Sequence, residues 1–298
     1  MRIVFFGTPS FAVPTLEALV AKHDVVMAVA QPDRPAGRGM KLHKPPVAER
    51  AAQLGIEVIQ PRKIRDEAFL TRMAATNADL AVVVAYGRIL PARLLAIPRQ
   101  GFVNVHASIL PKYRGAAPIQ RAIAAGDTKT GVTIMRVDEE LDHGPMLLIE
   151  ALEIGPHERM PSVSQRLATL GAAALVRALD DLGPGTPQDH SRATYAPKIE
   201  KSEGHITFAE SSSEIYNRFR AFDPWPGLFF GEVKVPELAR AEGGGEAGRI
   251  LSIDRNGVTV AAGEGAIRLI ELQRAGKNRA PATDVARVLG WQAGDRIS

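Results

Sequence analysis

The sequence predicts an α/β fold, in which a mostly parallel, doubly wound sheet is followed by a small domain of antiparallel strands. Up to residue 182, short apolar runs alternate with amphipathic runs, as strands and helices do in a parallel sheet. The run Leu80–Tyr86 is almost entirely Val, Ala and Leu, which is typical of a strand covered on both faces. Beyond residue 205, several short strand patterns separated by glycine turns favour a small OB-like β-barrel.

The first domain, residues 1–183, contains the alternating elements. Its expected strands are Arg2–Phe6, Asp24–Gln31, Ile56–Gln60, Leu80–Tyr86, 101–108, Gly131–Asp138 and Pro145–Ile154, the last two antiparallel. Its expected helices are Phe11–Val20 with Ser10 as N-cap, Val47–Leu54, Asp66–Thr76, a short helix within the loop Gly87–Ile97, Ala117–Ala125 and Met160–Leu182.

Residues 184–204 are rich in Pro, Gly and polar side chains, so we expect a linker there and a second domain over residues 205–298. The expected helices of that domain are Ser212–Phe222, with a serine cap, and Ala282–Leu289. Its expected strands are His205–Ala209, Leu228–Val235, Gly248–Asp254, Gly257–Ala262 and Ala266–Leu272, with a hairpin turn at Asn256-Gly257.

The composition limits the chemistry that the chain can perform. It has 298 residues and no cysteine, which excludes disulfides, thiolate nucleophiles and thiolate metal sites and favours a cytoplasmic location. No apolar run approaches the length of a membrane span, so we expect no membrane association. The histidines form no metal-binding pair, and no metal is expected. A dinucleotide-binding fingerprint needs three glycines after the first strand, and only Gly7 is present, so we expect neither NAD nor FAD to bind.

The net charge of +4 is confined to the first domain. Residues 205–298 carry twelve basic and twelve acidic residues, and residues 184–204 carry three of each. Much of the positive charge lies in one loop without acidic residues, at Arg34, Arg38, Lys41 and Lys44. The two arginines flank Pro-Ala-Gly, which favours close approach to phosphates. A solvated turn is the alternative, which four positive charges without an acidic partner fit only moderately.

Asn104 and His106 are two polar residues on one expected buried strand. Side chains two apart on a strand share a face, and parallel strands place ligands at their carboxyl ends. A buried amide needs a hydrogen-bonding partner, so the pair indicates a site, although a core histidine is the alternative for His106. Asp142 is a candidate third member, with an ordinary turn aspartate as its alternative. No Gly-x-Ser-x-Gly motif is present, so the set favours acyl transfer to an amine without a covalent intermediate.

At these residues the sequence resembles the 10-formyltetrahydrofolate-dependent formyltransferases, and within them the members that act on methionyl-tRNA. Asn104–Pro111 and Leu141–Gly144 are motifs shared by these formyltransferases generally, whereas Gln31–Gly39 and Arg114–Arg121 resemble the tRNA-dependent members. Further similar stretches are Phe6–Ala12, Val82–Gly87, Gly131–Met135, Thr194–Ala196 and Phe222–Pro226.

The resemblance implies a Rossmann-like formyltransferase domain and an OB-like domain that helps to hold tRNA. It implies formyl transfer from 10-formyltetrahydrofolate to initiator methionyl-tRNA for translation initiation, without a metal, by a chain that we expect to be a monomer. The residues that it implies are Asn104, His106 and Asp142 for catalysis, Ser108, Ile109, Leu110 and Pro111 for folate, and Arg34, Arg38 and Lys41 for tRNA.

The sequence departs from the usual family pattern at Ala107, His143 and Pro145, none of them in the proposed catalytic set.

Two other functions are open. A formyltransferase for a small amine, such as an amino sugar or a purine precursor, needs neither the basic loop nor the second domain. A non-catalytic RNA-binding protein is disfavoured by the intact Asn104, His106 and Asp142. The neutral charge of residues 205–298 requires that their arginines gather on one side if they bind RNA.

Overall fold

The computed structural model describes residues 1–36 and 41–297. The chain forms two compact units. The first consists of Met1–Pro118, Lys129–Glu153 and Ser164–Pro197, and the second of Ile119–Thr128, Ile154–Val163 and Lys198–Ser298. Most of the expected linker therefore folds with the first unit.

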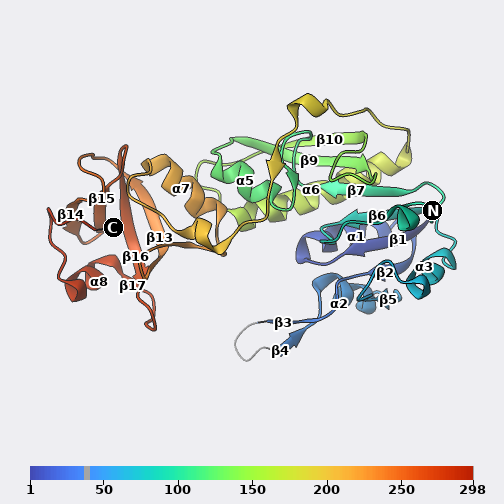
Figure 1. Ribbon diagram of the computed structural model, residues 1–298, viewed down its shortest axis with the longest axis horizontal. Helices are drawn as coiled ribbons and strands as arrows, with labels where there is room; N and C mark the ends of the chain where they lie inside the picture. The colour runs from blue at the N-terminus through green and yellow to red at the C-terminus, as the bar shows by residue number, and fades with distance from the viewer. Residues whose placement is uncertain (37–40, 298) are drawn as a thin grey trace. The chain divides into compact units, whose positions relative to one another are not determined.

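The first unit is built on a seven-stranded sheet in the order β10-β9-β7-β6-β1-β2-β5 (Figure 1). Five neighbouring strands are parallel, and β9 and β10 are antiparallel at one edge. The strands are β1 (Arg2–Gly7), β2 (Asp24–Val29), β5 (Val58–Ile59), β6 (Leu80–Val84), β7 (Phe102–His106), β9 (Lys129–Arg136) and β10 (Met146–Glu153). This order confirms the predicted mostly parallel sheet.

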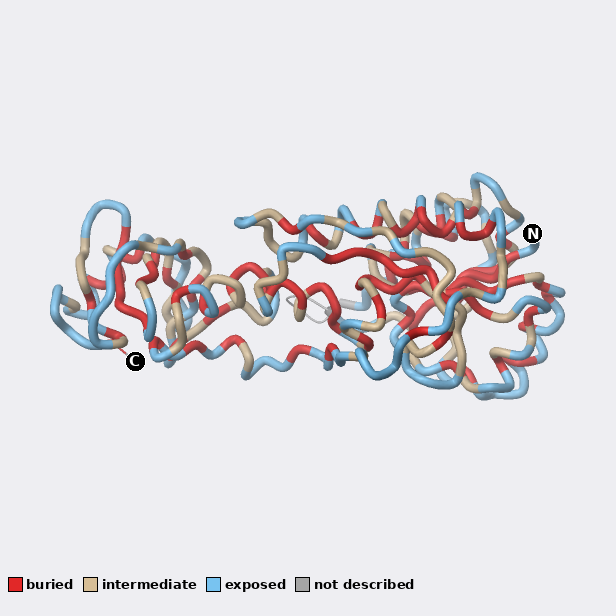
Figure 2. Tube along the Cα trace, turned by 90° about the horizontal axis from the view of Figure 1, so that it is seen from above, coloured by how far each residue is buried: buried red, intermediate tan, exposed pale blue. Residues whose placement is uncertain are grey.

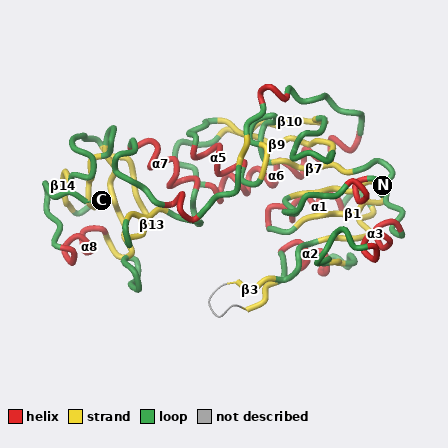
Figure 3. Tube along the Cα trace, viewed as in Figure 1, coloured by secondary structure: helices red, strands yellow, loops and turns green. Residues whose placement is uncertain are grey.

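The helices alternate with these strands along the chain (Figure 3). They are α1 (Val13–Val20), α2 (Pro46–Gln53), α3 (Glu67–Ala74), α4 (Ala92–Leu95), α5 (Pro118–Ala124) and α6 (Met160–Asp180). Their existence was predicted, and the observed ends differ by a few residues, as is usual for helix termini.

The core of the first unit lies along the central parallel strands, which form the densest buried region of that unit in Figure 2. Every residue of β6 is buried, as the uninterrupted apolar run predicted. Phe6 packs edge-on against Tyr86, with ring centroids 5.3 Å apart, and also contacts Phe102. These contacts fix the ends of β1 and β6 beside β7, the strand that carries Asn104 and His106.

Three local predictions in the first unit need correction. Ser10 is not a helix N-cap, because it begins a short 3-10 turn, Ser10–Ala12, and makes no capping hydrogen bond. The basic loop contains two short paired strands, β3 (Arg34–Ala36) and β4 (Lys41–His43), which no alternation in the sequence indicated. Within the expected linker, β11 (Tyr195–Ala196) pairs in parallel with β8 (Arg114–Gly115), so this part of the chain packs on the first unit.

The second unit contains a six-stranded antiparallel sheet in the order β12-β13-β16-β15-β14, with β17 paired to β16. The strands are β12 (Leu228–Phe230), β13 (Val233–Ala241), β14 (Ile250–Asp254), β15 (Gly257–Ala261), β16 (Ala266–Gln273) and β17 (Ala280–Pro281), and the helices are α7 (Ser212–Ala221) and α8 (Ala282–Leu289). Ser211 and Glu214 form a capping box at α7, which confirms the predicted serine cap.

Three predictions in the second unit were wrong in detail. Residues 205–209 form no strand, and His205 makes only a single bridge to Phe229. The expected strand 228–235 is two strands, β12 and β13, because the chain turns at Gly231. The hairpin between β14 and β15 turns at Arg255-Asn256 rather than at Asn256-Gly257.

Two arginines of the second unit serve its own structure. Arg220 is buried and donates hydrogen bonds to Asn217 and to the carbonyl oxygen of Gly155. Arg218 pairs with Glu210 and donates to the carbonyl oxygen of His205. These two charges are therefore used within the fold.

Arg121 and Glu203 form a two-pronged ion pair in the second unit, with N–O distances of 2.5 and 3.0 Å. The hydrogen bond from Arg121 holds the pKa of Glu203 below its ordinary value of 4.5. A carboxylate with a depressed pKa stabilises the fold above the unfolded-state pKa, and this contribution is lost as the pH falls through the folded-state pKa. Glu203→Gln is therefore expected to lower the free energy of unfolding by about 1 kcal/mol near neutral pH.

Urea unfolding of the wild type and the variant, at neutral pH and at successively lower pH, measures this effect. The difference in free energy of unfolding should shrink as the pH falls from 4.5 through the lower folded-state pKa, because Glu203 of the wild type becomes protonated first in the unfolded chain and then in the folded one. A difference that is independent of pH would contradict the ion pair as its cause.

Candidate active site

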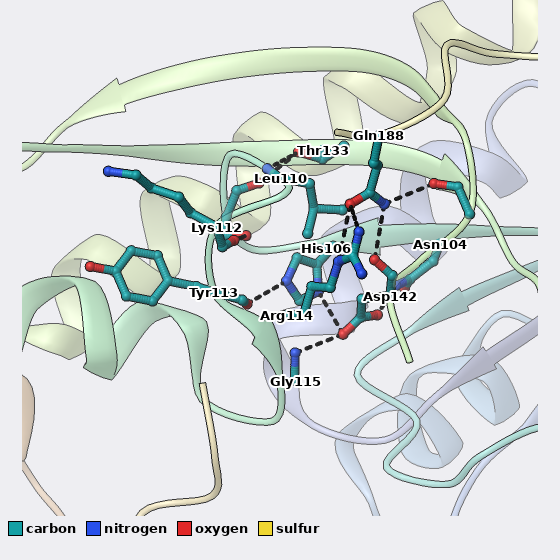
Figure 4. A network of polar contacts seen from close by, with 12 residues as sticks. Asn104, His106, Leu110, Lys112, Tyr113, Arg114, Gly115, Thr133, Asp142 and Gln188 are labelled. Atoms are coloured by element: carbon teal, nitrogen blue, oxygen red, sulfur yellow. Dashed lines mark hydrogen bonds and ion pairs between the residues drawn. The ribbon is translucent and has the colours of Figure 1, made fainter. Parts of the chain in front are cut away.

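Asn104 and His106 project from the same face of β7, as their spacing predicted (Figure 4). His106 is the last residue of the strand and is 5% exposed, and Asn104 is partly buried. Because β7 is parallel to β6, His106 lies at the carboxyl edge of the parallel part of the sheet. This is the edge at which open α/β sheets bind ligands.

Asp142 brings a carboxylate to these two side chains from the loop between β9 and β10. Its Oδ1 accepts a hydrogen bond from Asn104 Nδ2 at 3.3 Å, and its Oδ2 lies 3.5 Å from His106 Nδ1. Asp142 has φ 49°, a left-handed conformation that Asp tolerates better than most residues. The structure therefore brings the three predicted residues together, while their catalytic role stays a prediction.

A backbone contact fixes the proton arrangement of His106. Its Nε2 lies 2.9 Å from the carbonyl oxygen of Tyr113. A carbonyl oxygen only accepts hydrogen bonds, so Nε2 carries a proton and Nδ1 is the nitrogen that faces Asp142. The site thus combines N–H donors from Asn104 and His106 with one carboxylate. Such a set can stabilise negative charge on an oxygen and accept a proton nearby.

The residues predicted to contact folate follow His106 directly and form a tightly bonded turn. Ser108 Oγ donates to the carbonyl oxygen of Lys112 at 2.6 Å, and Thr133 Oγ1 donates to the carbonyl oxygen of Ser108 at 2.7 Å. The N–H of Leu110 donates to Thr133 Oγ1 at 3.1 Å. These bonds fasten the turn, which includes Ile109 and Pro111, to β9 beside the catalytic candidates.

The residues predicted to contact tRNA lie on the hairpin after β2. Arg34 begins β3 and is exposed, and Lys41 begins β4, opposite Ala36. Arg38 lies outside the described residues, so its prediction stands on the sequence alone.

Gln188 and Arg114 are buried polar residues of this site that the sequence did not reveal. Gln188 Nε2 donates to the carbonyl oxygens of Asp142 and Gly144, at 2.9 and 2.8 Å. Its Oε1 accepts from Arg114 Nε and Nη2, at 3.1 and 2.6 Å. Both side chains are at most 5% exposed. Gln188, on the segment expected to be a linker, thus holds the loop that carries Asp142, and Arg114 holds Gln188 in place.

The backbone of Gly115 also binds the Asp142 carboxylate. Its N–H donates to Asp142 Oδ2 at 2.8 Å. Its φ is 122°, and a Cβ atom there would lie 2.8 Å from the carbonyl oxygen of Ala196. Only glycine fits this position without strain, which places the β8–β11 pairing directly behind the carboxylate.

His143, one of the departures from the family pattern, packs beside Gln188 and Arg114 through His190. Its ring stacks on that of His190, with centroids 3.9 Å apart, and its Nδ1 lies 2.7 Å from Asp138 Oδ2. His190 Nδ1 is 2.8 Å from Arg114 Nη2 and must accept, because a guanidinium only donates. His143 therefore supports the segment around Gln188. Among the described residues, it forms no hydrogen bond with Asn104, His106 or Asp142.

Neither a metal centre nor a membrane span is found in the described chain. Within residues 1–36 and 41–297, no three His, Asp or Glu side chains group as metal ligands do. No helix in the same ranges is both long and apolar enough to cross a bilayer.

Comparisons with known families match nearly the whole chain. The model described as "Formyl transferase" matches residues 1–179, and the model described as "Formyl transferase, C-terminal domain" matches residues 198–290.

Curated relatives match over nearly their full lengths. A protein of Deinococcus radiodurans named "Methionyl-tRNA formyltransferase" is 46% identical, covering 99% of this chain and 95% of its own. One of the same name from Thermus thermophilus is 43% identical, covering 100% of this chain and 99% of its own.

A solved structure shows the same fold at low identity. The N-formyltransferase of Helicobacter canadensis, crystallised with folinic acid and dTDP-3-aminofucose, superposes with a TM-score of 0.66 at 18% identity. The match covers 90% of this chain and 98% of that one.

Proposed function

The chain belongs to the formyl transferase family, and from that premise we propose that it formylates methionyl-tRNA. It transfers a formyl group from 10-formyltetrahydrofolate to the amino group of initiator methionyl-tRNA. The product is N-formylmethionyl-tRNA, which serves translation initiation. The observation that carries this proposal is the sequence identity of 46% and 43%, over nearly the full length, to two relatives named "Methionyl-tRNA formyltransferase".

The alternative is a small-amine acceptor such as an amino sugar. Its support is the shared fold with the Helicobacter canadensis enzyme, and at 18% identity that likeness concerns the fold alone. The basic hairpin and the second unit also favour the larger acceptor, because neither is needed to bind a small amine.

Three side chains supply the chemistry in this proposal. The amino group of methionyl-tRNA attacks the formyl carbon of 10-formyltetrahydrofolate. The bond from that carbon to N10 then breaks, N10 takes up a proton, and tetrahydrofolate leaves. Asn104 Nδ2 carries a second N–H besides the one donated to Asp142, and this N–H donates a hydrogen bond to the oxygen on which negative charge develops. His106, or a water held by Asp142, accepts the proton that the amine loses. Three polar groups that converge beside the Ser108–Pro111 turn fit this role.

The remaining assignments follow the same proposal. Ser108, Ile109, Leu110 and Pro111 contact the folate, and Arg34, Arg38 and Lys41 contact the acceptor end of the tRNA. Residues 1–183 form the catalytic domain, and residues 205–298 form a tRNA-binding domain. Residues 184–204 connect the two, with their larger part packed on the first unit. The chain acts as a monomer in the cytoplasm, where translation takes place.

An acceptor panel tests the function. The purified chain is incubated with 10-formyltetrahydrofolate and, separately, initiator methionyl-tRNA, glycinamide ribonucleotide or a dTDP-amino sugar. Mass spectrometry of each acceptor should show a formyl group on the methionyl-tRNA alone. Faster formylation of either small amine would support the alternative.

Gln188 is expected to affect turnover by positioning Asp142. Gln188→Leu removes both hydrogen bonds to the carbonyl oxygens of the Asp142 loop. Because small displacements of reacting groups are costly, kcat should fall on the order of 10²-fold, with little change in KM for methionyl-tRNA. Steady-state kinetics give this split.

Gln165→Leu, on an exposed position of α6, is the matched control and should retain wild-type kcat. A Gln188→Leu variant that loses thermal stability but keeps wild-type kcat would show that Gln188 has only a structural role.

A further inference from the structure

The same sheet edge that carries His106 also carries a group of basic residues. β6, β2 and β5 are parallel strands, with β1 between β6 and β2. The loops that follow their carboxyl ends meet at one edge of the sheet, which is also where β7 ends at His106. The basic residues on these loops, here called the basic edge, are Arg34 after β2, Arg62, Lys63 and Arg65 after β5, and Arg88 after β6.

Hydrogen bonds join the three loops into one surface. Arg88 Nη1 donates to the carbonyl oxygens of Pro61 and Arg62, at 3.2 and 2.9 Å. Gln60 Nε2 donates to the carbonyl oxygen of Gln31 and to Asp33 Oδ1, at 2.8 and 2.7 Å. Arg62, Lys63 and Arg65 are exposed on this surface.

Two guanidinium groups of the basic edge converge on one neutral oxygen atom. Arg34 Nη2 and Arg88 Nε both donate to Gln31 Oε1, at 3.4 and 3.2 Å. Gln31 is 6% exposed, and its own amide donates to the carbonyl oxygen of Tyr86. Two cations that share one uncharged acceptor repel each other, and an anion between them would remove that repulsion.

The protein supplies no such anion within its described residues. Asp33, the nearest acid along the chain, accepts from Gln60 and forms no ion pair with either arginine in residues 1–36 and 41–297. Six other arginines of the same unit do meet carboxylates. These are Arg2, Arg50, Arg72, Arg93, Arg99 and Arg177. Arg114 and Arg136 also meet no carboxylate among the described residues, but they bond Gln188 and backbone carbonyl oxygens separately. The basic edge differs because two of its guanidinium groups converge on one neutral oxygen atom.

We propose that Arg34 and Arg88 together bind one backbone phosphate of the RNA acceptor, and that Arg62, Lys63 and Arg65 extend this contact along the strand. The planar guanidinium group suits the oxygens of a phosphate, and the edge leads along the sheet toward His106. This inference rests on the proposed function, since it names where the acceptor's backbone is held. It adds Arg88 and the 62–65 segment to the residues that the hairpin contributes.

The test compares Arg34→Met, Arg88→Met and the double variant with the wild type. Steady-state kinetics with methionyl-tRNA are measured over a range of salt concentrations. Each single variant should raise KM for methionyl-tRNA by about tenfold while KM for the folate donor stays unchanged. In the double variant, the slope of log(kcat/KM) against log salt should fall by about 0.7 to 0.9, the value for one phosphate contact.

Arg93→Met is the matched control, because Arg93 is exposed on the same unit but paired with Glu67. It should leave both KM values and the salt slope unchanged. An unchanged salt slope in the double variant, with only the melting temperature lowered, would overturn the proposal. Arg88 would then have only a structural role, joining two loops by hydrogen bonds. A rise in KM for the folate donor alone would also overturn it and assign the anion to the folate. If the wild type does not formylate methionyl-tRNA, the proposed function fails instead.

Discussion

Replacing His106 by alanine is expected to lower kcat for formylation of methionyl-tRNA by about 10³-fold or more. The change removes the proton acceptor beside Asp142 at the end of β7, together with its hydrogen bond to the carbonyl oxygen of Tyr113. Binding of methionyl-tRNA should stay within about twofold of the wild type, because the side chain is buried at the reacting centre rather than on the basic edge. Single-turnover rates and a filter-binding titration measure the two quantities separately.

His157→Ala is the control for this variant, since His157 is exposed and lies in the second unit. It should keep wild-type kcat. A loss of tRNA binding in His106→Ala as large as its loss of rate would make His106 a structural residue and remove it from the proposed chemistry.

Asp142→Asn is expected to lower kcat by about 10² to 10³-fold. Asp142 accepts hydrogen bonds from Asn104 Nδ2 and from the N–H of Gly115, and it faces His106 Nδ1. An asparagine there has only one accepting oxygen, so its amino group must face a donor. The negative charge beside His106 is also lost. Rapid-quench kinetics at saturating substrates report the chemical step directly.

Asp181→Asn, at an exposed position after α6, should leave kcat unchanged and is the control for charge removal. A kcat for Asp142→Asn within about twofold of the wild type would contradict the role proposed for the carboxylate.

The features that the sequence predicted well depend on periodicity or on strong local signals. The two-residue spacing of Asn104 and His106 placed both on one face of β7. The apolar run of β6 indicated burial on both faces. Ser211, with Glu214 three residues on, formed the capping box that serine caps favour. In each case a local pattern was sufficient because the structural cause is also local.

The features that were missed depend on contacts between distant segments. Gln188 stands alone in a Pro-rich stretch, and only the pairing of β11 with β8 brings it to Asp142. Ser10 resembles an N-cap, but the chain makes a 3-10 turn there before α1 begins at Val13. Arg114 lies in a stretch that carries the family resemblance, but nothing in the sequence indicated its bonds to Gln188. Tertiary packing decides such positions, and no local pattern encodes it.

The most direct test of the central claim is a single-turnover reaction with 10-formyltetrahydrofolate labelled in its formyl group. The enzyme is mixed with the labelled donor, initiator methionyl-tRNA and an equal concentration of a dTDP-amino sugar, and the reaction is quenched at successive times. The proposed function predicts that the label passes from the folate to the methionyl-tRNA alone, without a formylated protein at any time. Label on the protein chain, or on the amino sugar in preference to the tRNA, would contradict direct formyl transfer to methionyl-tRNA at the Asn104, His106 and Asp142 site.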